Sequence, residues 1–143
     1  MKRLPSWLEK CYDNRGGRKV IYMVHKNLVE HSLQNENFRS VVLTNQHSQL
    51  VLMSLLPSEE IGEEVHDVDQ ILFITQGLGH AILDGVSDEI KSGDIVNVPA
   101  GAKHNVINSE SGSMKLFTVY SPPEHKDGTV HKTKAEAEAA EHH

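Results

Sequence analysis

The most informative segment of the chain is Gly93-Asp-Ile-Val-Asn-Val-Pro99-Ala-Gly101-Ala-Lys-His104-Asn-Val-Ile-Asn108, which fits the spacing G-x5-P-x-G-x2-H-x3-N. Gly93 permits a sharp turn into a strand, and Pro99 ends that strand because proline has no N–H for the ladder. Gly101 then reverses the chain, so that the following strand turns His104 inward. The spacing therefore predicts two strands with an imidazole at the mouth of a barrel.

Short apolar runs separated by turn residues extend from Asn37 onward at intervals of about ten residues, a pattern typical of a β-sandwich or barrel. The expected strands are Phe38–Thr44, Gln49–Leu56, Gln70–Thr75, His80–Leu83, Ile95–Val98, Asn105–Ile107 and Lys115–Tyr120. Asp84-Gly85 and Ser92-Gly93-Asp94 supply turns between antiparallel strands. No long helical periodicity interrupts the runs, so the sequence predicts an all-β, antiparallel fold.

The chain divides into three parts: an N-terminal extension of uncertain structure (1–35), a barrel (36–123) and a polar C-terminal tail (124–143). In the extension, the apolar cluster at residues 20–24 can add an edge strand, pair with another subunit or stay loosely ordered. In the tail, strong helix formers follow Thr133, with Glu136 three residues later. This pattern predicts a short surface helix that contributes little to the core.

Length and cysteine content limit the class of protein. The 143 residues are enough for one domain with its own core. Cys11 is the only cysteine, which excludes an intramolecular disulfide and a cysteine-based zinc site and favours a cytoplasmic location. No apolar segment approaches the length of a membrane span, and residues 1–25 lack the features of a secretory signal. We therefore expect no membrane association.

The net charge of −6 is unevenly distributed. Residues 1–35 contain seven basic and three acidic residues, so they carry +4 and the remainder carries −10. Non-specific nucleic-acid binding depends on Lys and Arg neutralising phosphates, and the acidic balance argues against it. We interpret the basic extension as a solvated, partly mobile arm rather than a nucleic-acid contact.

Possible metal ligands also occur upstream, in Gly62-Glu-Glu-Val-His66-Asp67-Val-Asp69-Gln70. His66 and His104 with an amide or carboxylate oxygen suit a borderline divalent ion (Mn, Fe, Ni, Co or Zn) and leave coordination positions open for a substrate. Gln70 is neutral where a Glu would be charged, so it would hold the ion less tightly and leave it a stronger Lewis acid.

The two segments resemble the two sequence motifs of the cupin superfamily. The first motif normally reads G-x5-H-x-H-x3–4-E-x6-G, and Gln70 takes the place of its Glu. Counting back from Gln70 puts Asp67 and Val65 at the two His positions, which makes the loop one residue short. Either the loop absorbs the difference and His66 still reaches the metal, or the site is weakened or lost.

From about residue 35 to its end the chain is similar to small single-domain cupins grouped with mannose-6-phosphate isomerase-like proteins. The similarity is closest at residues 47–55, 61–70, 98–105 and 120–134. It implies an antiparallel double-stranded β-helix, or jelly-roll barrel, and one divalent metal ion bound by His66, Gln70 and His104.

The leading functional hypothesis is a metal-dependent cupin acting on a small polar metabolite, with a sugar-phosphate isomerase as the specific candidate. Glu64, Asp67 or Asp69 would serve as the general base. The alternatives are a non-enzymatic module that binds a small ligand or metal, and a metal-dependent dioxygenase, because one fold hosts all of these. A homodimer is expected, since a small jelly roll leaves sheet edges exposed.

Overall fold

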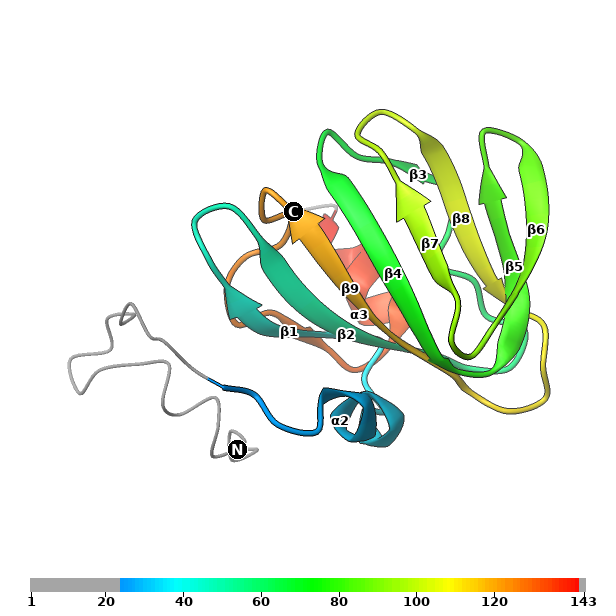
Figure 1. The fold of residues 1–143 in the computed structure, drawn as a ribbon, viewed down its shortest axis with the longest axis horizontal. Helices are drawn as coiled ribbons and strands as arrows, with labels where there is room; N and C mark the ends of the chain where they lie inside the picture. Colours follow the sequence, from blue (N-terminus) through cyan, green and yellow to red (C-terminus); the bar gives the residue numbers. More distant parts are fainter. Residues whose placement is uncertain (1–23, 142–143) are drawn as a thin grey trace.

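Two antiparallel sheets face each other in the computed structural model, which describes residues 24–141 (Figure 1). The six-stranded sheet has the order β10 (Val130–His131), β1 (Arg39–Thr44), β2 (Gln49–Leu55), β9 (Met114–Ser121), β4 (Asp69–Gln76) and β7 (Ile95–Val98). The four-stranded sheet has the order β3 (Glu64–Val65), β8 (Lys103–Asn108), β5 (Leu78–Leu83) and β6 (Val86–Lys91). The prediction of an all-β, antiparallel double-stranded β-helix is confirmed.

All the strands expected from the sequence are present, with ends shifted by at most two residues. Three further strands, β3, β6 and β10, were not expected. Strands β3 and β10 are two residues long, and β6 is an edge strand whose side chains are all exposed except Ile90. Such strands form through backbone hydrogen bonds and leave no apolar run in the sequence.

The predicted turn at Asp84-Gly85 joins β5 and β6 as a two-residue hairpin, because Leu83 pairs with Val86. Asp84 and Gly85 have φ values of 46° and 85°, and two positive angles are what a type I′ turn requires. The side chain of Asp84 also accepts a hydrogen bond from the Lys103 amide (2.9 Å), which ties the hairpin to the start of β8.

Aliphatic side chains fill the space between the sheets. Val51, Leu55 and Leu72 of the six-stranded sheet are fully buried, and so are Met114 and Leu116. This core matches the low aromatic content of 5%. The buried apolar residues show which face of each strand points inward. Polar residues on that same face therefore also lie inside the barrel.

Helix α2 (Leu28–Gln34) lies against the outer face of the six-stranded sheet, close to β9 and β4 (Figure 1). The hydroxyl groups of Ser32 and Thr75 are 2.7 Å apart, and the Lys115 ammonium donates to the Asn35 carbonyl. The last part of the expected extension is therefore packed on the barrel. Residues 20–23 of the predicted apolar cluster lie outside the described residues.

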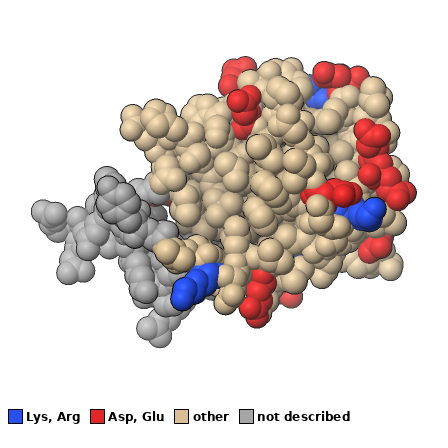
Figure 2. Space-filling view, viewed as in Figure 1, with Lys and Arg blue, Asp and Glu red and all other residues tan. Residues whose placement is uncertain are grey.

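The centre of the face seen in Figure 2 is largely uncharged, and the acidic side chains lie towards the periphery of the view, many of them on the side of the four-stranded sheet. Ile71 on β4 and Ile95 on β7 are 36% and 59% exposed. The rings of Phe73 and Phe117 stack on this face with centroids 4.7 Å apart. Part of the outer face of the six-stranded sheet is therefore apolar.

The C-terminal helix α3 (Lys134–Glu141) begins as predicted, after Thr133. The Thr133 hydroxyl accepts from the Glu136 amide (3.1 Å), and the Glu136 carboxylate accepts from the Lys132 amide (2.7 Å). The helix lies on the surface as predicted and contributes a single small side chain to the core, that of Ala137, which is 3% exposed. Its small side chain lets the helix backbone approach the barrel closely. No helix among residues 24–141 is long and apolar enough to span a membrane.

Candidate metal centre

Glu64, His66 and His104 form a cluster at one end of the four-stranded sheet. Glu64 on β3 pairs directly with His104 on β8, and His66 follows Glu64 by two residues, so the three side chains share a face. One possible ligand atom from each residue lies within 4.8 Å of the other two. Donor atoms bonded to one ion at about 2.1 Å lie up to about 4 Å apart, so a small adjustment would bring all three onto one ion.

His104 is held in an orientation that suits a metal ligand. Its side chain is buried, and its Nδ1 lies 3.0 Å from the Ala102 carbonyl oxygen. A carbonyl oxygen only accepts, so Nδ1 carries a proton, and in the neutral ring this leaves the Nε2 lone pair for a metal ion. Metal-binding histidines are commonly oriented by this kind of hydrogen bond.

His66 lies between two carboxylates. Its Nε2 is 2.8 Å from Glu64 Oε2, and its Nδ1 is 3.2 Å from Glu124 Oε1. The hydrogen bond to Glu64 raises the pKa of His66, burial opposes this, and the charges of Glu64 and Glu124 raise it further. The ring of His66 is 5.0 Å from that of His104. The surroundings of His66 therefore favour a positive charge, either a proton or a metal ion.

Gln70 has an oxygen acceptor without a partner. The side chain is 3% exposed, and its Nε2 donates to Thr118 Oγ1 at 3.1 Å. Its Oε1 is buried and accepts no hydrogen bond from the described residues. A buried acceptor left unsatisfied costs about 1–3 kcal/mol, which a bound cation would offset. The donor set of two imidazoles, one carboxylate and one amide oxygen fits a borderline divalent ion.

The register of β3 and β8 changes the alignment with the first cupin motif. Glu64 and His66 are separated by one residue, and Gln70 follows His66 after three, which matches the ligand spacing H-x-H-x3-E without any deletion. The expected shortening of the loop is therefore absent, and Glu64 stands at the first His position. Val65 is 58% exposed and Asp67 is also exposed, so neither belongs to the cluster. This E-x-H-x3-Q spacing of Glu64, His66 and Gln70 is a signal in the sequence from which Glu64 could have been identified as a possible ligand.

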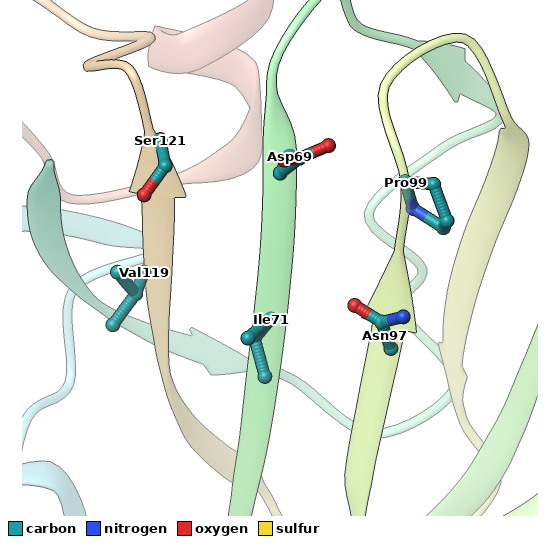
Figure 3. A pocket seen from close by; sticks show the side chains of 6 residues that line it. All are labelled: Asp69, Ile71, Asn97, Pro99, Val119 and Ser121. Atoms are coloured by element: carbon teal, nitrogen blue, oxygen red, sulfur yellow. The ribbon is translucent and has the colours of Figure 1, made fainter. Parts of the chain in front are cut away.

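The structure separates the three carboxylates considered as general bases. Glu64 belongs to the cluster, while Asp67 is exposed. The carboxylate of Asp69 accepts a hydrogen bond from the Ala100 amide (2.9 Å). Asp69 also lines a cavity of about 310 Å³ on the outer face of β9, β4 and β7, together with Ile71, Asn97, Pro99, Val119 and Ser121 (Figure 3). Of these three carboxylates, only that of Glu64 therefore lies beside His66 and His104.

Comparisons with known proteins agree with this architecture. Residues 51–120 match the family model of the cupin domain. A crystal structure from Bacillus halodurans is 34% identical and superposes with a TM-score of 0.81, covering 82% of this chain and 95% of that one. An uncharacterized protein of Acanthamoeba polyphaga mimivirus is 39% identical over 115 residues, which are 77% of this chain and 71% of that protein.

The chain belongs to the cupin family. The uncharacterized protein YrkC of Bacillus subtilis is 44% identical over 115 residues, covering 76% of this chain. This cupin spans 62% of the length of that relative.

Further polar residues of this cupin surround the cluster, although no spacing in the sequence points to them. Tyr120 is 2% exposed, and burial raises the pKa of its hydroxyl. The ring of His125 contacts that of Tyr120 edge-on, with centroids 5.1 Å apart. Burial first, and then the charges of Arg39 and His66, lower the pKa of His125 to about 3. His125 is therefore neutral at physiological pH, and the positive charge at the site belongs to other groups.

Proposed function

We propose that this cupin binds one divalent metal ion through Glu64, His66, Gln70 and His104 and acts on a small polar metabolite. The observation that supports the metal site is the cluster of Glu64, His66 and His104, with possible ligand atoms within 4.8 Å of one another. The unsatisfied Gln70 oxygen supports it independently. A bound Mn, Fe, Ni, Co or Zn ion would polarise a carbonyl or hydroxyl oxygen of the metabolite.

For the reaction, we propose proton transfer on a hydroxy-carbonyl compound, as in a sugar isomerase. The side chain of Glu124 is 29% exposed and its Oε1 lies 3.2 Å from His66 Nδ1, so it is a carboxylate at the site that is not needed in the cluster. It is a better candidate for the general base than Asp67 or Asp69, which lie away from the cluster. Lys103, the only basic residue within the Gly93–Asn108 motif, could contact a phosphate group of such a substrate, but it is exposed and pairs with Glu63 (3.1 Å).

A binding module without catalysis is the second candidate, because the cupin fold by itself does not specify a reaction. The two functions differ in what bound metal does. In an enzyme, turnover follows the metal content, whereas a binding module gains thermal stability from its ligand without converting it. A dioxygenase would need Fe(II) and would consume oxygen. Oxygen-uptake measurements with an anaerobic control distinguish it from the other two.

The metal site is tested by elemental analysis of untagged protein purified without a metal-charged column. We expect about one divalent ion per chain and a melting temperature that falls on chelation. His104→Ala should lose the ion. His80→Ala is the matched control, because His80 lies on the neighbouring strand β5 and contacts only the Ser109 hydroxyl among the polar groups of residues 24–141. An absence of bound metal, with melting unaffected by added Mn or Zn, would disprove the proposal.

We further propose that the protein works as a homodimer in the cytoplasm. The apolar outer face of the six-stranded sheet, with Ile71 and Ile95 exposed, supports a second copy as the partner. The chain is acidic, so charged surfaces of two copies repel each other. An uncharged face is therefore the surface on which two copies can meet. The cytoplasmic location follows from the lone Cys11.

A further inference from the structure

Arg39 is a buried cation that forms no ion pair with any carboxylate in the described part of the chain. Its side chain faces the barrel interior, because Arg39 pairs across the sheet with the core residue Met53. The residue is 3% exposed. Its Nη1 lies 3.3 Å from His131 Nδ1, its guanidinium carbon is 5.4 Å from the Phe38 ring centroid, and its Nε has no partner. Arg39 therefore keeps donors available inside the barrel.

Arg39 and Glu64, one residue of the candidate metal centre, border the same cavity. This cavity has a volume of about 270 Å³ and is lined by Phe38, by Arg39 at the start of β1, by Glu64 and its neighbours, and by α3. The charge of Arg39 also contributes to lowering the pKa of His125 and opposes the rise at His66, which places the guanidinium within electrostatic range of the cluster. A ligand in this cavity would touch both Arg39 and the Glu64 side of the cluster.

Four carboxylates also line the cavity, and three of them already have partners. Glu64 contacts His66, and Glu138 lies 3.8 Å from the Lys134 ammonium. Glu63 pairs with the Lys103 ammonium. The fourth, Glu141, is exposed at the end of α3. Two cations line this cavity: Lys134 already faces the Glu138 carboxylate, whereas Arg39 has no carboxylate partner among residues 24–141. A doubly charged anion would be repelled by the surrounding carboxylates.

We propose that Arg39 binds the carboxylate of the metabolite, so that the ligand of this cupin is a small hydroxy or keto acid. The planar guanidinium presents paired N–H donors that match a carboxylate, and a carboxylate carries a single negative charge. A second oxygen of the same acid would then face Glu64, His66 and His104. The cavity volume suits an acid of a few carbons. This inference rests on the proposed metal function and narrows its substrate class from sugar phosphates to acids.

The test is calorimetric titration of the full chain, with and without Mn, using lactate, pyruvate, lactamide and inorganic phosphate. We expect the Mn-loaded protein to bind lactate or pyruvate at least tenfold more tightly than lactamide or phosphate. Arg39→Gln should weaken acid binding at least tenfold with the metal content unchanged, and Arg39→Lys should weaken it less. Lys103→Gln removes one exposed cation near the cluster and should change affinity less than twofold, which controls for net charge.

Failure of this inference differs from failure of the metal site. If the wild type binds no metal but still binds the acids in an Arg39-dependent manner, the metal proposal fails and the role of Arg39 stands. Equal affinity for lactate and lactamide, tighter binding of phosphate, or no binding of either acid would overturn the inference. Wild-type affinity in Arg39→Lys and Arg39→Gln would also overturn it. The lactate and lactamide comparison uses the wild type, so it holds even if Arg39→Gln does not fold.

Discussion

Glu64 and His104 lie directly opposite each other in the antiparallel pair of β3 and β8. Side chains at such positions project from the same face with Cβ atoms about 5 Å apart, a spacing that lets a carboxylate and an imidazole share one ion. The two-residue strand β3 thus fixes half of the proposed metal site through its backbone register. The other half, His66 and Gln70, follows along the same segment.

Gln70→Glu should lower the stability of the metal-free protein and raise its affinity for metal. The new carboxylate would be buried without a counter-charge, so we expect a lower melting temperature in the presence of chelator. With a divalent ion, the added negative charge should strengthen binding roughly tenfold, which corresponds to about 1.4 kcal/mol. Competition with a chelating dye and melting curves with and without Mn measure both effects. A variant with unchanged metal affinity would remove Gln70 from the ligand set.

The fold was predictable because the turn residues dictate it locally. Gly93 and Gly101 have φ values of 96° and 88°, which glycine adopts without strain, and each lies at the reversal expected from the spacing. By contrast, β6 was not predictable, because five of its six residues are exposed and contribute nothing to the core. Its existence depends on pairing with β5, a tertiary interaction.

The candidate site was only partly predictable. The positions of Gln70 and His104 follow from motif spacing, but Glu64 depends on the register between two strands that are distant in sequence. Arg39 stands at the start of an apolar run, where a charged residue usually marks an exposed strand end. Its inward direction is set by pairing with Met53, which the sequence alone does not give.

Gly79→Ala should destabilise the protein strongly. A Cβ at this position in β5 would lie 2.0 Å from the Ile107 carbonyl oxygen and 2.6 Å from Met114 Cε. The oxygen belongs to the neighbouring strand and cannot move away without breaking the ladder, so we expect a loss of about 3 kcal/mol or more. Gly112→Ala is the control, because no atom lies within 4 Å of its added Cβ. Urea denaturation compares the two, and equal midpoints would contradict the packing argument.

His125 should make the metal-free protein sensitive to acid. Burial holds its pKa at about 3 in the folded state, while the unfolded chain has the ordinary value of about 6.5. Between these values only the unfolded chain binds the proton. The stability contribution is therefore complete above about pH 6.5 and is lost progressively as the pH falls towards 3.

The comparison of wild type with His125→Gln isolates this effect, because the opposite contribution of His66 is present in both proteins. Between pH 7 and pH 5 the wild type should lose about 2 kcal/mol more than the variant. Urea midpoints in chelator-containing buffer at the two pH values give the difference. Parallel pH profiles would show that protonation of His125 does not oppose folding.

Ile95→Glu should weaken the proposed homodimer. Ile95 is 59% exposed on β7, at the edge of the six-stranded sheet, and a carboxylate there would be buried against the uncharged face of the second copy. Loss of apolar contact together with the cost of burying an unpaired charge should raise the dimer dissociation constant at least about tenfold. Val86→Glu is the matched control, since Val86 is 64% exposed on β6, an edge of the other sheet. Sedimentation across a range of protein concentrations measures all three proteins. A wild type that stays monomeric, or equal weakening by both variants, would show that the outer face of the six-stranded sheet is not the interface.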